Sequence, residues 1–270
     1  MAACEEQRFE FGKNWMDYVR SNLSQEKIDI SKKHILDFIG CEGLDGLSFL
    51  DIGCGSGLHS IAALQAGAAS VHGFDYDRNS VAATRYVQEQ MGNPPNWTVE
   101  QGSVLDPAFV GALPLHDIVY SWGVLHHTGA VWDAIRAAAS RVKPGGLFYI
   151  ALYSADVQIN PPPEFWLDVK RRYVSSGWLT RRWMELWYIL RFQIGRDPRN
   201  VVRFLRYAAE YKKKRGMNVL VDIRDWLGGW PMEFVRDADA VEFCQSLGFT
   251  LKNIRTGEAC TEFLFARNAG

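Results

Sequence analysis

The stretch Phe49-Leu50-Asp51-Ile52-Gly53-Cys54-Gly55-Ser56-Gly57 carries the strongest structural signal in the chain. Its first half is an apolar run of strand length, and its second half places glycines at alternate positions. Glycine lets the backbone turn sharply and lets a ligand approach the bare main chain. A helix is expected directly afterwards, and the first amides of a helix have no intrahelical partner. The stretch therefore predicts a strand, a turn that faces a ligand, and a helix.

Short apolar segments alternate with helical patterns on both sides of this turn. Such alternation is typical of a parallel sheet that helices cover on both faces. The last two strands are joined by a short turn, which indicates an antiparallel edge at the C-terminus. We expect a doubly wound α/β fold with a mostly parallel seven-stranded sheet, whose strands are residues 48–52, 70–74, 97–100, 116–121, 147–152, 249–254 and 261–266.

Composition points to an ordinary soluble protein that functions in the cytoplasm. The chain has 270 residues, a net charge of −1 and 47% hydrophobic residues, so its overall charge does not indicate nucleic-acid binding. The five cysteines are dispersed without metal-ligand spacing, which predicts free thiols and no metal centre. The N-terminal segment lacks the pattern of a signal peptide, and no apolar run reaches the roughly 18 residues needed to span a bilayer.

The pattern divides the chain into a core and two additions. Residues 1–47 are expected to form an N-terminal helical cap, with a helix that starts near residues 29–31 and ends at Gly40. The sheet domain is expected to comprise residues 48–160 and 232–270. The run of prolines at 161–163 interrupts it, and residues 161–231 are expected to form a helical insertion after the fifth strand.

An acidic residue stands at the end of the second predicted strand. Asp75 lies 22 positions after Gly53, which is about the spacing at which a carboxylate reaches a ribose diol. The glycine spacing is GxGxG rather than GxGxxG, which argues against a dinucleotide pyrophosphate loop. Together, the loop and the acid predict a site for a nucleoside-containing ligand.

With Asp51 just before the glycines, this arrangement resembles the motif of class I S-adenosylmethionine-dependent methyltransferases, and the resemblance continues in order over residues 48–152. It implies S-adenosylmethionine as cofactor, S-adenosylhomocysteine as product and a Rossmann-like methyltransferase fold. In that family the loop lies against the methionine part of the cofactor and the acid holds the ribose. The resemblance assigns the following residues to cofactor binding: Asp51, Gly53, Cys54, Gly55, Gly57, Asp75, Tyr76, Ser103, Val104, Ser121 and Trp122.

Three of these assignments have a particular basis. Tyr76 is placed next to the adenine, and Ser103 stands where the family often has an acid in its adenine-edge motif. Trp122 belongs to a segment that borders both cofactor and acceptor in the family, although a wall of the core is an equal alternative. Trp15, on the first expected helix, either closes over the cofactor or packs in the core.

Two adjacent histidines follow the fourth predicted strand. Methyl transfer from a sulfonium is an in-line displacement, so the enzyme's main contribution is alignment in a dry cleft. A hydroxyl or phenol acceptor must also lose a proton, and histidine suits that task near neutral pH. By resemblance to small-molecule O-methyltransferases of ubiquinone and antibiotic pathways, His127 is favoured over His126 as the general base.

The insertion is rich in tryptophan and arginine. Residues 164–215 contain 14 Lys and Arg against 5 Asp and Glu. One interpretation is an aromatic acceptor pocket, with Trp166 in its wall and Arg171 as a clamp for an anion. A second is an amphipathic surface for peripheral membrane contact or a lipid acceptor. The third is a lid whose indoles pack inward and whose arginines are solvated.

A stretch after the basic segment adds candidate acceptor contacts. Residues 222–231 mix charge, glycines and two indoles, and we expect a functional loop there. Asp225, Trp226 and Trp230 are the acceptor contacts that this stretch suggests.

The sequence thus favours a methyltransferase that acts on a small molecule, at oxygen rather than nitrogen or carbon. An RNA methyltransferase remains an alternative because the insertion is basic. A dinucleotide-dependent oxidoreductase and a non-catalytic, cofactor-binding partner subunit are the others. The acceptor and the oligomeric state are not determined by the sequence.

Overall fold

A mixed sheet of seven strands forms the centre of the computed structural model, which describes residues 12–157, 160–195, 197, 199–215, 219–257 and 259–269. The strand order is β3-β2-β1-β4-β5-β7-β6; β1 to β5 pair in parallel, and β7 pairs antiparallel with both β5 and β6. The expected doubly wound fold with an antiparallel edge is confirmed. The strands are β1 Ser48–Ile52, β2 Ser70–Asp75, β3 Trp97–Gln101, β4 His116–Trp122, β5 Val142–Tyr153, β6 Phe249–Thr256 and β7 Cys260–Arg267.

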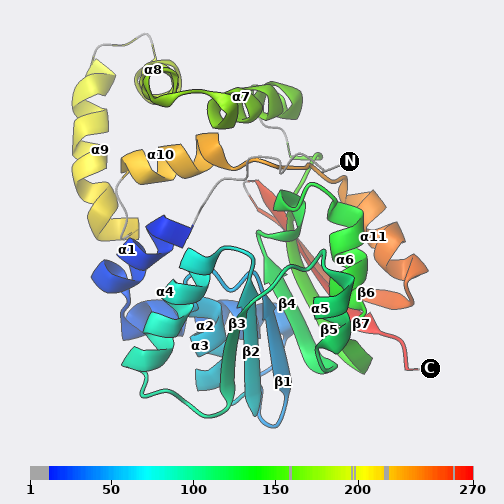
Figure 1. Ribbon diagram of the computed structural model, residues 1–270. Coiled ribbons are helices and arrows are strands. Elements are labelled where there is room, and N and C mark those ends of the chain that lie inside the picture. Colours follow the sequence, from blue (N-terminus) through cyan, green and yellow to red (C-terminus); the bar gives the residue numbers. More distant parts are fainter. Residues whose placement is uncertain are drawn as a thin grey trace.

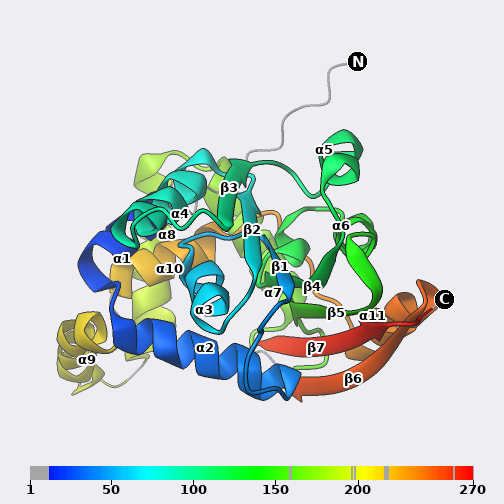
Figure 2. The ribbon, with the colours of Figure 1, turned by 90° about the horizontal axis from the view of Figure 1, so that it is seen from below.

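Helices cover both faces of this sheet, as Figures 1 and 2 show. On one face, apolar side chains of α2, α3 and α4 pack against Phe49, Tyr120 and Tyr149. On the other, α6 and α11 pack against Phe148 and Phe265. Because both faces are buried, the strands read as apolar runs rather than alternating ones. The helices are α1 Gly12–Asn22, α2 Gln25–Ile39, α3 Leu58–Gln65, α4 Arg78–Gln90, α5 Pro107–Ala112, α6 Val131–Ala139 and α11 Asp237–Ser246.

Two elements begin several residues earlier than expected from the sequence. Helix α2 begins at Gln25 rather than near residue 29, because the Ser24 hydroxyl caps it by accepting from the Lys27 amide. Its end at Gly40, in the left-handed region with φ 81°, is as expected. Strand β5 begins at Val142 rather than at residue 147, so residues 143–146 also belong to the strand.

Helices between β5 and α11 form a lid above one end of the sheet (Figure 1). They are α7 Pro163–Ser175, α8 Trp178–Tyr188, the π-helical turn η2 Ile189–Ile194, α9 Arg199–Arg215 and α10 Val219–Gly228. The lid has a small core of its own, in which Trp166 and Tyr173 pack against Ile223 and Leu227. All five elements fall within the predicted insertion, 161–231.

The expectation of a loop at residues 222–231 is wrong for most of that stretch. Helix α10 runs to Gly228, because Val219, Ile223 and Leu227 recur at helical spacing and bury one face in the lid core. Glu185 of α8 supports the same packing, since it accepts hydrogen bonds from Arg182 at 2.7 Å, Arg224 at 3.2 Å and the Tyr173 hydroxyl at 2.9 Å.

Among the described residues, no helix is long and apolar enough to cross a bilayer.

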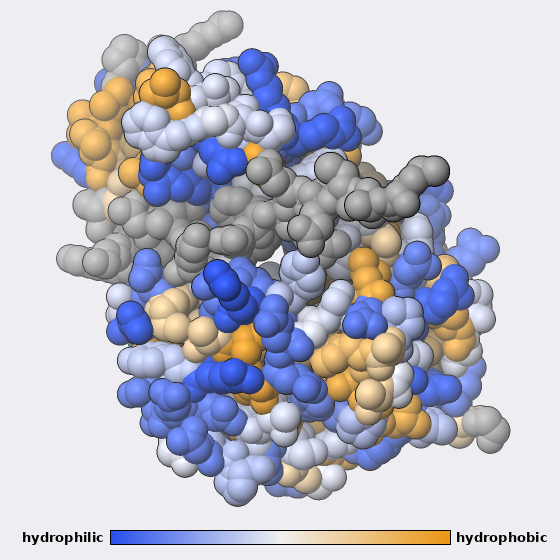
Figure 3. All heavy atoms as spheres, viewed as in Figure 1, coloured by the Kyte–Doolittle hydropathy of each residue, from blue (hydrophilic) through white to orange (hydrophobic). Residues whose placement is uncertain are grey.

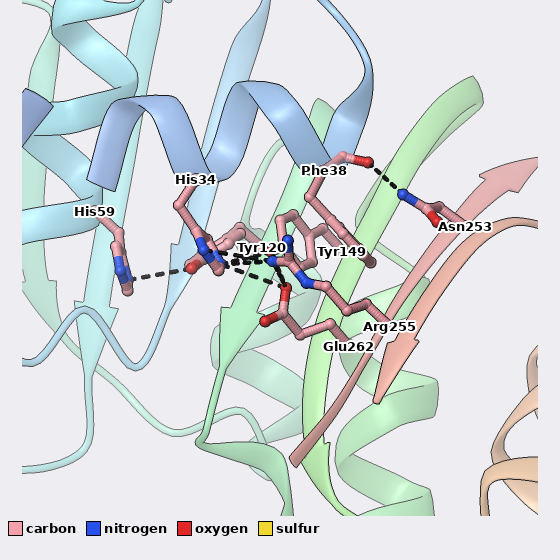
Figure 4. Close-up of polar contacts among 8 residues, drawn as sticks. All are labelled: His34, Phe38, His59, Tyr120, Tyr149, Asn253, Arg255 and Glu262. Atoms are coloured by element: carbon pink, nitrogen blue, oxygen red, sulfur yellow. Dashed lines mark hydrogen bonds and ion pairs between the residues drawn. The ribbon is translucent and has the colours of Figure 1, made fainter. Parts of the chain in front are cut away.

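A buried polar network fastens α2 to the antiparallel edge of the sheet (Figure 4). Glu262 of β7 accepts from the Tyr149 hydroxyl at 2.5 Å and from Arg255 at 2.8 Å, and it lies 3.3 Å from His34 Nε2. Asn253 of β6 donates to the Phe38 carbonyl of α2 at 2.9 Å. Burial raises the pKa of Glu262, but hydrogen bonds from His34 and Tyr149 outweigh it and bring the pKa to about 2.

Glu262→Gln is expected to destabilise the protein at neutral pH by about 1–3 kcal/mol, because it removes a charged acceptor from a partly buried network. Since the folded pKa lies below the ordinary value of 4.5, the stabilisation is complete above pH 4.5 and is lost as pH falls towards 2. Urea unfolding should therefore show a large difference between variant and wild type near neutral pH and a smaller one in acid. An equal difference at both would contradict this role.

Candidate active site

Two cavities lie at the end of the sheet below the lid. The first, called the cleft, has a volume of about 600 Å³ and lies along the ends of β1, β2 and β4. The second, called the lid cavity, has a volume of about 460 Å³ and is lined mainly by α10, with one residue each from α7, α8, η2 and α9. His127, Tyr153 and Asp222 line both, so the two cavities meet at these side chains.

The glycine loop after β1 forms one wall of the cleft. The Gly53 and Cys54 amides donate to the Phe74 carbonyl at 2.8 and 3.1 Å, which fixes the loop against the end of β2. Gly53 has φ +77°, and a Cβ there would lie 2.5 Å from the Val124 side chain. Gly55 has φ +53°, and its Cβ would lie 3.3 Å from Trp15 Nε1. Only glycine fits at these positions, and Trp15 lies over the loop at the cleft wall.

Asp75 ends β2 opposite this loop. Its carboxylate accepts from the Gly55 amide at 3.0 Å and from the Asp77 amide at 2.9 Å. Burial raises the pKa of Asp75 to about 6, although the two amides counteract the rise. The group is therefore mostly ionised at neutral pH and can accept further hydrogen bonds from hydroxyls in the cleft.

Most residues assigned to cofactor binding line the cleft, and three do not. The lining members are Trp15, Gly53, Cys54, Gly55, Asp75, Tyr76, Ser103, Val104 and Trp122. Asp51, Gly57 and Ser121 are not among them. Asp51 is buried and accepts from the Ser60 hydroxyl at 2.6 Å, and the Ser121 hydroxyl donates to the Ile52 carbonyl at 3.0 Å. These two side chains hold the strand ends beneath the loop.

The adjacent histidines face different surroundings. His127 Nδ1 lies 2.8 Å from the Pro231 carbonyl. Because a carbonyl only accepts, Nδ1 carries the proton and Nε2 is the basic nitrogen. Desolvation lowers the pKa of His127 to about 4, so the ring is neutral at physiological pH. His126 is fully buried, lines neither cavity, and accepts from the Tyr153 amide at 3.3 Å.

The candidate acceptor residues are divided among three places. Asp225 and Trp226 line the lid cavity, and Trp230 lines the cleft. Trp166 is buried in the lid core. Arg171 is exposed and lies with its guanidinium 5.0 Å from the Trp230 ring centroid. Trp166 and Arg171 line neither cavity, so the pocket interpretation of the insertion does not extend to them.

Several lining residues were not predicted as site residues. Tyr153 stands at the end of β5, where strand ends of this architecture meet ligands, and that position was a usable signal. Lys170 falls on the apolar stripe of α7 with Trp166, Tyr173 and Val174, and a charge on such a stripe is unusual. His59, which lines the cleft and contacts the Tyr120 hydroxyl at 3.2 Å, gave no such signal.

No three His, Cys, Asp or Glu side chains come together as a metal site in the part of the chain that the structure describes.

The seven-stranded sheet with its antiparallel edge, the glycine loop after β1 and the acid at the end of β2 are together those of a class I S-adenosylmethionine-dependent methyltransferase. The family model of a methyltransferase domain matches residues 24–200, and the chain belongs to this family. The family resemblance inferred from the sequence is thereby confirmed, and the oxidoreductase alternative is excluded.

The chain spans between about a third and about half of the length of three curated relatives. The ubiquinone biosynthesis O-methyltransferase of Methylobacterium sp. (strain 4-46) is 29% identical over 153 residues, 56% of each chain. That of Paramagnetospirillum magneticum is 38% identical over 140 residues, 51% of each. The tRNA U34 carboxymethyltransferase of Idiomarina loihiensis is 32% identical over 108 residues, 39% of this chain and 32% of its own.

Solved structures extend the similarity of fold to nearly the whole chain. Magnesium protoporphyrin IX methyltransferase from Synechocystis PCC 6803, solved with S-adenosylmethionine bound, has a TM-score of 0.55 and 16% identity over 99% of this chain and 100% of its own. An O-methyltransferase family protein from Burkholderia thailandensis has a TM-score of 0.56 and 15% identity over 94% and 59%. At these identities the likeness establishes the fold alone.

Proposed function

We propose that the protein transfers the methyl group of S-adenosylmethionine, bound in the cleft, to a small-molecule hydroxyl or phenol bound in the lid cavity. The observation that carries this proposal is the junction of the two cavities at His127, Tyr153 and Asp222. A donor in one cavity and an acceptor in the other would meet there.

The cleft offers what the cofactor requires. The bare backbone of the glycine loop suits close approach of the methionine part, and Asp75 suits the ribose hydroxyls. Tyr76, Ser103 and Val104 also line the cleft, and Tyr76 and Ser103 are proposed to contact the adenine. When bound, the cofactor supplies a methyl group on a positively charged sulfur. Asp75 is then a binding residue and takes no part in the displacement.

His127 is suited to receive the acceptor proton. The Pro231 carbonyl holds the Nδ1 proton, so Nε2 accepts. A base whose pKa is about 4 does not ionise a free phenol, but a hydroxyl becomes strongly acidic as its oxygen gains the methyl group. A weak, correctly placed base is then sufficient. His126 is proposed to support Tyr153 and the turn rather than to act on the acceptor.

The acceptor is proposed to be a small molecule that is methylated at oxygen. The volume of the lid cavity, about 460 Å³, suits a small molecule. The similarity to ubiquinone biosynthesis O-methyltransferases supports oxygen as the atom methylated. An RNA acceptor is the second candidate, supported by the basic composition of residues 164–215 and the likeness to a tRNA-modifying enzyme.

His127→Gln is expected to bind S-adenosylhomocysteine as the wild type does and to lose about 10²–10⁴-fold in turnover, since only the proton acceptor is removed. Transfer of labelled methyl to a panel of phenols and hydroxylated aromatics measures this. With cofactor and acceptor saturating, the wild-type rate should also fall as pH drops through about 4, where His127 is protonated.

His72→Gln is the matched control, because His72 lies on β2, hydrogen-bonded to Glu100 and outside both cavities. It should leave turnover unchanged. If a His126→Ala/His127→Ala double variant bound cofactor and kept near-normal turnover, the proposed base would be wrong.

A further inference from the structure

We propose that the Lys170 ammonium is the anion-binding subsite of the lid cavity, and that the acceptor carries a carboxylate or phenolate that docks there. This inference rests on the proposed function and names the chemistry of its acceptor. Lys170 was not expected from the sequence to contact a ligand.

Lys170 has the position expected of a ligand-binding group. It lines the lid cavity although only 1% of its surface is exposed. Its Nζ donates to the Trp226 carbonyl and lies 4.0 Å from the Trp226 ring centroid. Within the described part of the chain, no carboxylate forms an ion pair with this ammonium. A buried cation is thus held by one carbonyl and one aromatic face.

Such a cation is costly without an anionic partner. Removing an ammonium from water costs several kcal/mol even in a relaxed protein. Burial accordingly lowers the pKa of Lys170 to about 7. Asp222 and Asp225 line the same cavity, but each is already engaged with another group of the chain. An anionic acceptor would therefore be attracted at Lys170, which favours one orientation of the acceptor in the cavity.

Binding of an anion at Lys170 would also change the pKa of the proposed base, His127. After desolvation, the Lys170 charge is among the causes that lower the pKa of His127. An anion bound at Lys170 would offset that charge and so raise the pKa of His127. His127 would therefore be a stronger base when the acceptor is bound than when it is absent. Lys170 would hold the acceptor directly, and it would affect proton transfer indirectly by changing the pKa of His127.

Binding of matched pairs to the protein saturated with S-adenosylhomocysteine tests this subsite. The carboxylate arm compares 4-hydroxybenzoate, salicylate and benzoate with their neutral amides by calorimetry. The phenolate arm compares 2,4-dinitrophenol, which is charged at about pH 6 where Lys170 is protonated, with neutral phenol. We expect at least one charged member to bind about tenfold or more tightly than its neutral partner. The arm that shows this difference identifies the anion.

Lys170→Met should reduce that difference to about twofold or less and leave S-adenosylhomocysteine binding intact. Its stability should be equal or higher, because an apolar side chain replaces a buried charge. Arg172→Met, an exposed neighbour on α7, should keep the preference. Equal binding of charged and neutral partners, binding of neither, or a preference that survives Lys170→Met overturns the subsite. If the wild-type protein did not bind S-adenosylhomocysteine, the proposed function would be overturned instead.

A separate observation concerns the outer face of the lid. Trp178, Leu179 and Trp183 of α8 are 66%, 69% and 69% exposed. Leu186 and Leu190 continue the stripe at helical spacing, and Val202 and Leu205 of α9 are exposed as well. Figure 3 shows apolar side chains gathered at the upper left, over α8 and α9 of Figure 1. Large apolar side chains exposed together indicate an interaction surface.

The charge of the insertion indicates what covers this face. Residues 164–215 contain 14 Lys and Arg against 5 Asp and Glu, whereas the rest of the chain contains 16 against 26. Indoles and leucines flanked by arginines on surface helices are typical of proteins that bind at the lipid interface. We infer that this face docks on an anionic lipid surface. The inner side of the same segment, Tyr188 and Gln193, lines the lid cavity.

Cosedimentation with vesicles of phosphatidylcholine, with and without phosphatidylglycerol, tests the docking. We expect binding to the anionic vesicles, weakened by salt, with a blue shift of tryptophan fluorescence. Trp178→Ser/Trp183→Ser should weaken it about tenfold or more, whereas Ile30→Ser, which removes an exposed apolar residue of α2, should not. No binding to anionic vesicles, equal binding by the double variant, or binding to RNA or a second copy instead would overturn this inference.

Discussion

The hydrogen bond from the Gly55 amide to the Asp75 carboxylate joins the ends of two neighbouring strands and fixes the geometry of the cleft. The Phe74 carbonyl adds two more bonds to the same loop. Beneath the loop, the buried Asp51 accepts from Ser60 of α3. With the strand ends held in this way, the loop can present bare backbone to a ligand while α3 starts directly behind it.

The second constraint ties the lid to the chemistry. Pro231 follows α10, and its carbonyl selects the tautomer of His127. Two residues later, the Glu233 amide donates to the His126 carbonyl at 2.8 Å, and its carboxylate accepts from the Val131 amide at 2.9 Å. The returning end of the lid is therefore attached to the turn that carries the histidines. Formation of the lid cavity and orientation of the proposed base depend on the same segment.

Local patterns were sufficient to predict the sheet and the cleft. Residues 49–57 and Asp75 were recognised by their spacing along two neighbouring strands. Such spacing can be read directly from a sequence. The helical lid was also visible from composition. Helix α10 was missed because its charges and glycines obscured the apolar positions Val219, Ile223 and Leu227.

The lid cavity was harder to predict because long-range packing decides it. His126 and His127 are adjacent, and contacts with distant parts of the chain, such as the Pro231 carbonyl 104 positions from His127, distinguish their surroundings. Lys170 lies in a basic segment and reads as a solvated residue, whereas the fold buries it beside Trp226. Trp166 is an aromatic residue of the kind that lines ligand pockets, but it packs into the lid core. Burial in the folded chain, rather than residue type, separates these cases.

Calorimetric titration with S-adenosylmethionine and S-adenosylhomocysteine, with NAD as control, measures whether the cleft binds the cofactor. We expect one site per chain with a dissociation constant of about a micromolar, equivalent to about −8 kcal/mol, and no heat with NAD. We also expect Asp75→Ala to abolish binding while the protein stays folded. Absence of binding to either compound by the folded wild-type protein, or unchanged affinity in Asp75→Ala, would contradict cofactor binding in the cleft.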